Sequence, residues 1–209
     1  MLDKTTTYPE LRANPRLIEC HLNQAFQTAD MQRICEAIGE AVRAQNVASF
    51  SLEAGVERAY LYKAFDSERG PRLSTMLRVV TALGLGLVAK PKYKICRQPR
   101  RNDAPADLMD RLDLLSKPVS IAGYLNDAFD TSDLQSICAA LSLVIQAQGN
   151  FAGFARQTEI ERTSLYRAFR WPRTPEFAAV LRILDVLELR LAVKRTRIAT
   201  RLNSRAIAS

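Results

Sequence analysis

Apolar positions recur at the spacing of one helix face over residues 56–65. That face consists of Val56, Leu61, Ala64 and Phe65. The positions between them are mostly polar or charged and therefore point elsewhere. A second short stretch, residues 48–54, lies just upstream, and Gly55-Val56 separates the two. Two short helices joined by a tight turn indicate a helix-turn-helix, in which the second helix enters the major groove of DNA.

The same pattern returns in the second half of the chain, where residues 160–169 repeat residues 56–65 and residues 152–158 repeat residues 48–54. The halves align with a shift of about 103 positions up to Gln45 and about 104 beyond it, and roughly 40% of aligned positions are identical. Shared landmarks are Leu22-Asn23 with Leu125-Asn126, Ile34-Cys35 with Ile137-Cys138, and Leu77-Arg78 with Leu181-Arg182. Helix periodicity alone does not produce this identity, so the sequence predicts a tandem duplication.

Each copy is predicted to contain further helices and one short strand. In the first copy the pattern predicts helices over residues 15–26, 31–45 and 72–83, and a strand over residues 85–90 with its counterpart at 189–194. Thr28 or Asp30 can cap the helix that starts at Met31, and Asn46 is expected to end it. A lone strand leaves its backbone groups unpaired, so we expect the strand of the other copy to pair with it.

The predicted fold class is mainly α, with two tandem helix-turn-helix domains that each end in a short strand. Glycine, proline and charge mark the boundaries between the parts. The predicted parts are an N-terminal arm at 1–14, the first repeat at 15–91, a basic, proline-containing linker with a short helix at 92–118, the second repeat at 119–195, and a basic C-terminal tail at 196–209.

Charge and composition narrow the class of partner. The chain has 209 residues, a net charge of +8 and 47% hydrophobic residues, which suits two cores of modest size. A basic protein favours an anionic partner. Nucleic acid is favoured over a membrane, because no apolar run approaches the roughly 20 residues needed to span a bilayer. Many basic soluble proteins bind no DNA, so charge alone does not decide. The N-terminus lacks the apolar core of a secretory signal, and we expect a cytoplasmic protein.

The sequence contains few of the residues that a metal site or a catalytic nucleophile needs. His21 is the only histidine, and the four cysteines form no Cys-x-x-Cys pair. Cys35 and Cys138 occupy equivalent positions on the expected inner side of a helix, where each is most simply a small core residue. No glycine-rich phosphate loop or nucleophile–base pair is present either. We therefore expect no metal, no cofactor and no enzymatic activity.

Several stretches of the second copy together resemble a known family. They are Tyr124-Leu125-Asn126-Asp127-Ala128-Phe129, a helix ending in Ala147-Gln148-Gly149, then Ser164-Leu165-Tyr166-Arg167-Ala168-Phe169, and a helix followed by Leu187-Glu188-Leu189-Arg190-Leu191-Ala192-Val193. This order resembles the addiction-module antidote (HigA-like) proteins of the Xre, or lambda-repressor-like, helix-turn-helix group. The resemblance covers both repeats but neither the linker nor the tail.

The resemblance implies a fold and a set of partners. A single domain of this family forms a dimer, binds its own operator, and in many systems neutralises a small ribonuclease toxin encoded beside it. The family usually carries polar residues at the start of the upstream motif helix, where they approach phosphate, whereas here the matching positions hold Ala48-Ser49 and Ala152-Gly153. Of these, Ser49 is the expected DNA contact. The turn glycine of the motif is Gly55 in the first copy but Glu159 in the second, so the second turn departs from the family pattern.

We expect the two repeats to form a pseudo-dimer that pairs the two strands and sets two recognition helices side by side. Two-fold helix-turn-helix dimers bind DNA half-sites about 10 base pairs apart in this way. Spacing from the turn gives the groove-facing positions. In the first copy they are Glu57, Arg58, Ala59, Tyr60 and Lys63, and in the second Glu161, Arg162, Thr163, Ser164 and Arg167.

The expected roles of these residues follow from their donors and acceptors. Arg58 and Arg162 can offer two donors to guanine or can bind phosphate, whereas Lys63 and Arg167 lie farther along and suit phosphate. The two glutamates can accept from cytosine or cap the helix. Tyr62 and Tyr166 suit half-buried packing as well as phosphate contact.

Three functions remain open from sequence. The first is a transcriptional regulator that recognises an imperfect palindrome in double-stranded DNA, as a monomeric pseudo-dimer or a homodimer. The second is an antitoxin-like protein that neutralises a RelE/HigB-type toxin and autoregulates its operon. The third is a degenerate helix-turn-helix protein that binds only another protein, such as another regulator. Retention of the basic residues in both copies disfavours the third.

Overall fold

A computed structural model describes residues 11, 14–66, 70–93, 117–148, 151–169 and 173–196. The predicted linker helix, the basic tail beyond Thr196 and most of the N-terminal arm lie outside these residues. The described helices and strands therefore belong to the two repeats.

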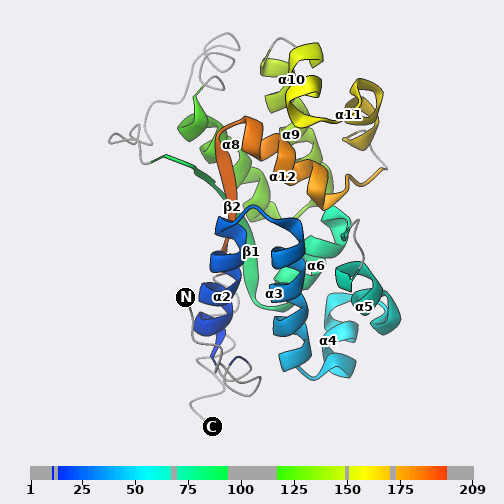
Figure 1. The fold of residues 1–209 in the computed structure, drawn as a ribbon. Coiled ribbons are helices and arrows are strands. Elements are labelled where there is room, and N and C mark those ends of the chain that lie inside the picture. The colour runs from blue at the N-terminus through cyan, green and yellow to red at the C-terminus, as the bar shows by residue number, and fades with distance from the viewer. Residues whose placement is uncertain are drawn as a thin grey trace. The chain divides into compact units, whose positions relative to one another are not determined.

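The two repeats contain the same elements in the same order (Figure 1). The first comprises α2 (Pro15–Gln27), α3 (Met31–Ala44), α4 (Val47–Ala54), α5 (Arg58–Asp66), α6 (Leu73–Ala82) and β1 (Leu85–Pro91). The second comprises α8 (Pro118–Thr131), α9 (Leu134–Ala147), α10 (Phe151–Thr158), α11 (Arg162–Ala168), α12 (Phe177–Val186) and β2 (Leu189–Arg195). The predicted fold class is confirmed, and the predicted boundaries differ from these by one or two residues.

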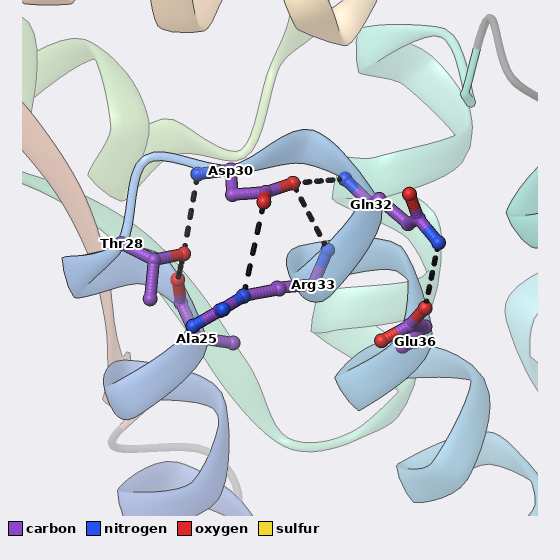
Figure 2. Close-up of polar contacts among 6 residues, drawn as sticks. All are labelled: Ala25, Thr28, Asp30, Gln32, Arg33 and Glu36. Carbon is purple, nitrogen blue, oxygen red and sulfur yellow. Dashed lines mark hydrogen bonds and ion pairs between the residues drawn. The ribbon is translucent and has the colours of Figure 1, made fainter.

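The start of α3 is fixed by local side-chain hydrogen bonds (Figure 2). The Asp30 carboxylate accepts from the backbone N–H groups of Gln32 and Arg33, at 2.8 and 3.3 Å. These two N–H groups have no partner within the helix, so the cap satisfies them. Thr28 instead accepts from the Asp30 N–H at 3.2 Å and holds the preceding turn. Of the two predicted caps, Asp30 is therefore the residue that caps α3.

The prediction that Asn46 ends α3 is wrong. The helix ends at Ala44 with Gln45 as its C-cap. Asn46 has extended backbone angles, and its side-chain oxygen accepts from the Ala48 N–H at 3.2 Å. It therefore begins α4, because an asparagine side chain satisfies the first N–H groups of a helix as readily as its backbone ends one. The comparable role predicted for Gly149 lies outside the described residues.

The turn after the first motif helix has the same geometry in both repeats. Gly55 takes φ 61° and Glu159 takes φ 54°, both in the left-handed region. In each repeat the next residue donates to a carbonyl five positions back, Val56 to Ser51 and Ile160 to Ala155. This is the hydrogen bonding of a Schellman motif, which normally ends in glycine. Glu159 adopts the turn despite having a Cβ, which makes left-handed angles unfavourable for it.

The described residues divide into two compact units that do not follow the repeat boundary. Unit 1 lies within Met1–Leu87, Glu176–Ala178 and Ala192–Ser209, and unit 2 within Val88–Pro175 and Ala179–Leu191. Unit 1 thus contains α2 to α6 together with the end of β2 and the start of α12. Phe177 illustrates this, since it is buried in unit 1, where its ring meets Phe26 edge to face at 6.3 Å.

The strands form a two-stranded antiparallel sheet, as expected from the unpaired backbone of each. The Thr196 N–H donates to the Gly84 carbonyl at 3.1 Å, and the Lys92 N–H donates to the Glu188 carbonyl at 2.8 Å. This register places Ala89 and Val193 at positions whose backbone groups point away from the partner strand. A two-stranded sheet has only edges, so these outward groups need other partners.

One asparagine in each unit supplies those partners. Asn23 donates to the Val193 carbonyl at 3.0 Å and accepts from the Val193 N–H at 2.8 Å. Asn126 forms the same pair of bonds with Ala89, at 3.0 and 2.7 Å. A side-chain amide presents one donor and one acceptor, as a neighbouring strand does. Each compact unit therefore joins a helix of one repeat to the strand of the other.

Replacing Asn23 or Asn126 by alanine is expected to lower the free energy of unfolding by about 2 to 3 kcal/mol, because two backbone groups lose their partner. Urea unfolding followed by circular dichroism measures this. Gln27→Ala, at an exposed position of α2, is the matched control and should change stability by less than about 0.5 kcal/mol. Equal stability of the Asn23→Ala and Gln27→Ala proteins would contradict the assignment.

The two turns should respond in opposite directions. Gly55→Ala is expected to cost about 1 kcal/mol, because an added Cβ meets nothing within 4 Å and only the left-handed backbone opposes it. Glu159→Gly should gain about 1 kcal/mol for the same reason. Gly123→Ala, in the exposed interior of α8, is the control and should stabilise by roughly 0.5 to 1 kcal/mol. Thermal unfolding of the three variants tests these signs.

Candidate nucleic-acid interface

The inner face of α5 anchors it in unit 1. Leu61 is only 2% exposed, and Ala64 and Phe65 are also buried. The helix packs on α3 and α4, and Val56 in the preceding turn is buried as well. The predicted inner face is therefore confirmed. In α11 the equivalent Leu165 is buried, as is Phe169 at its end, so the second motif is anchored by the same positions.

All of the sequence-predicted contact positions lie on the solvent side. Their side chains are exposed at Ser49, Glu57, Arg58, Ala59, Tyr60 and Lys63 in unit 1, and at Glu161, Arg162, Thr163, Ser164 and Arg167 in unit 2. Apart from Ser49 on α4, each lies on α5 or α11 or immediately before it. Burial of one face thus places these side chains on the solvent side of each helix.

The aromatic residues of α5 are part of this exposed surface. Tyr60 is 41% exposed and Tyr62 is similarly half-exposed. Large aromatic rings left in water on a small helix are suited to a partner surface. In α11 the equivalent positions hold Ser164 and Tyr166, and the side chain of Tyr166 lies outside the described residues.

The second repeat has a polar side-chain contact at the start of α11. The Ser164 hydroxyl donates to the Glu161 carboxylate at 3.3 Å. Glu161 occupies the N-cap position of α11, but its side chain caps no backbone N–H there. The hydrogen bond holds the carboxylate on the exposed side of the helix, where it can accept from a partner.

Two exposed features were missed from the sequence. The Arg78 guanidinium donates to the Gly55 carbonyl at 3.2 Å and so ties α6 to the turn of the motif. Its identity with Arg182 in the second repeat was a usable signal. Leu52, on α4, is 84% exposed, whereas its counterpart is Arg156. Its helical spacing alone gave no sign of that exposure.

Burial raises the pKa of two cysteine thiols. It raises the pKa of Cys35 to about 11, with further contributions from the charges of Glu36 and Asp66. The pKa of Cys138 is raised to about 11 by burial and by Asp133. Both thiols stay protonated at neutral pH, and a protonated thiol is a weak nucleophile and metal ligand. These two residues are core side chains, as predicted.

Two other kinds of site, a metal site and a surface hollow, bear on what the described residues can bind. Over the described ranges, no group of three His, Cys, Asp or Glu side chains is placed to hold a metal ion. A polar hollow along α2 in unit 1 includes Glu19 and Arg195, which form an ion pair at 3.3 Å. Arg195 is the last residue of β2.

The length and hydropathy of the described helices bear on whether any of them could cross a bilayer. None of them is by itself long and apolar enough to cross a bilayer. One pair, Leu134–Ala147 with Ala152–Thr158, reaches the required length and composition only when counted together, across a bend of 116°.

Comparison with known families now decides the relationship. A family model described as "Probable addiction module antidote protein" matches residues 7–91 and again residues 106–195. The two matches together cover most of the chain and place one copy of the family domain in each repeat. The chain belongs to this family of probable addiction-module antidotes. The predicted duplication is confirmed by the same result.

A curated relative is consistent with this assignment. It is an uncharacterized protein of Haemophilus influenzae, 34% identical over 68 residues, which are 32% of this chain and 70% of the relative. The relative is therefore long enough for one repeat and too short for two. No solved structure matches this antidote-family chain.

The buried thiols should be inert in the folded protein. At a pKa of about 11 the thiolate fraction is about a hundredfold lower than at 9, and burial restricts access further. In a protein with Cys20 and Cys96 changed to serine, modification by a disulfide reagent at pH 8 should be slow until denaturant is added. Rapid modification of the folded protein, at the rate of free cysteine, would show that these thiols are accessible.

Proposed function

We propose that this antidote-family protein is a sequence-specific double-stranded DNA-binding regulator with two helix-turn-helix heads in one chain. Head 1 consists of α4, its turn and α5, and head 2 of α10, its turn and α11. The supporting observation is that both heads expose an arginine at the same place, Arg58 and Arg162, the first residue of each second helix. N-terminal residues of a recognition helix are the ones that reach base edges.

The exposed side chains suit the parts of a DNA site. Each arginine can place two donors on guanine or bind phosphate. Lys63 and Arg167 lie farther along their helices and suit backbone phosphate, as does Ser49 near the start of α4. Glu57 and Glu161 can accept from the cytosine amino group. The net charge of +8 provides the general attraction to the polyanion.

Two heads in one chain imply a two-part operator. Two-fold helix-turn-helix proteins bind half-sites about 10 base pairs apart, or roughly 34 Å. A covalent link keeps the second head at high local concentration once the first has bound. The two helices differ in sequence, so we infer an imperfect palindrome. Regulation of this kind takes place on the chromosome, and we infer a cytoplasmic protein that uses no cofactor or metal and catalyses no reaction.

Arginine-to-alanine changes test the proposal on DNA from the protein's own upstream region. Arg58→Ala and Arg162→Ala should each weaken binding by about 1 to 3 kcal/mol and relax the preference at one position of one half-site. Arg43→Ala and Arg190→Ala remove the same charge from exposed positions outside the heads and serve as controls. Binding is measured by fluorescence anisotropy across a salt series, together with footprinting.

Specific outcomes would contradict the proposal. If Arg58→Ala and Arg162→Ala left affinity and sequence preference as they are in the control variants, the heads would not be the contact surface. A footprint limited to one half-site would show that the heads do not act together.

The family assignment favours a second activity beside the first. Members are described as probable addiction-module antidotes, so neutralisation of a RelE/HigB-type toxin is the alternative function. The test is co-purification with the product of an adjacent gene for a small basic ribonuclease, followed by an RNA-cleavage assay. Full cleavage in the presence of excess protein would rule out neutralisation of that toxin, and it would leave DNA binding unaffected.

A further inference from the structure

The recognition helices of the two heads differ chemically at two adjacent positions. The first two outward positions are identical, Glu57 with Glu161 and Arg58 with Arg162. The last outward position is basic in both heads, Lys63 and Arg167. Between them, head 1 has Ala59-Tyr60 where head 2 has Thr163-Ser164. Any difference in the bases that the recognition helices contact must therefore arise mainly from these two pairs.

Both pairs lie where base contact is most direct. They are the second and third residues of α5 and of α11, and all four side chains are exposed. None of them is needed to fill a core, because the buried positions of these helices are other residues, such as Leu61 and Leu165. Exchange between the heads is thus free of the packing constraint that normally limits substitutions.

The chemistry of the two pairs selects different base edges. Ala59 and the ring of Tyr60 present an apolar surface, which matches the thymine methyl group in the major groove. Thr163 and Ser164 present hydroxyls, and Ser164 also donates to the Glu161 carboxylate. A carboxylate held on the exposed side is an acceptor for the cytosine amino group.

We propose that Ala59-Tyr60 and Thr163-Ser164 set the difference between the two half-sites. Head 1 selects a thymine at the base that Ala59 and Tyr60 contact. Head 2 selects a cytosine at the base that Glu161 reaches. This inference rests on the DNA binding proposed above. It assigns the asymmetry of the operator to two residues in each head.

The test exchanges the pairs within the full chain. Sites are first selected for the unchanged protein from a random DNA library, and then for Ala59→Thr/Tyr60→Ser and for Thr163→Ala/Ser164→Tyr. The first double variant should select two copies of the head 2 half-site, and the second two copies of the head 1 half-site. On the original site each double variant should lose about tenfold or more in affinity.

A chemical probe isolates the methyl contact. Replacing thymine by deoxyuracil removes only the methyl group from that base. In the head 1 half-site this change should weaken binding by the unchanged protein severalfold, and in the Ala59→Thr/Tyr60→Ser variant it should have no effect. Binding that is indifferent to the methyl group in both proteins would overturn the assignment for head 1.

A matched control separates specificity from general surface change. Leu52→Arg gives head 1 the residue that head 2 has at the equivalent exposed position of α4, outside the recognition helix. It should leave the selected half-sites unchanged. Circular dichroism and thermal unfolding confirm that each variant is folded.

The results distinguish this inference from the proposed function. If the unchanged protein selects no DNA sequence, the proposed function fails. If it selects a two-part site and the exchanged variants still select that same site, DNA binding stands and the assignment of asymmetry to these pairs is overturned. Selection of a perfectly symmetric site by the unchanged protein would overturn it too.

Discussion

The structure depends on satisfying the outward backbone groups of a sheet that has only two strands. Such a sheet is marginal alone, because every strand is an edge. Asn23 and Asn126 close the edges by imitating a third strand at Val193 and Ala89. Asn23 lies on α2 and Asn126 on α8, the first described helix of each repeat, and each strand residue belongs to the other repeat, so the compact units combine the repeats. Backbone hydrogen bonding therefore links the duplicated sequences more closely than a tether would.

Duplication within one chain also explains how the two heads can differ. In an assembly of identical subunits, a substitution in one recognition helix appears in every copy. Here Tyr60 and Ser164 occupy equivalent positions in one molecule, as do Gly55 and Glu159. The framework that holds the helices, including Leu61 and Leu165, is retained, because buried side chains tolerate little change in volume. Exposed positions are under no such constraint, so their residues can change to suit the partner that each helix contacts.

The family assignment and the geometry support different parts of the functional argument. Two matches to the antidote family establish what each repeat is related to. Arg58 and Arg162 are both exposed at the start of their helices, which is the observation behind the proposed contact surface. The proposal of DNA as the partner rests on chemistry, since the paired donors of an arginine match guanine or phosphate. The family description suggests a toxin as the alternative partner.

The sequence by itself determined the duplication, the order of elements and the inner face of α5, because helical spacing and internal identity are local properties of the chain. It also offered Thr28 or Asp30 as the cap of α3, and the structure decided for Asp30. Only the tertiary structure decided that Asn23 and Asn126 bind strand backbone 170 and 37 residues away along the chain. It also decided that Glu159 takes left-handed angles and that Arg78 ties α6 to the turn. These features depend on which distant groups meet, and side-chain spacing does not encode that.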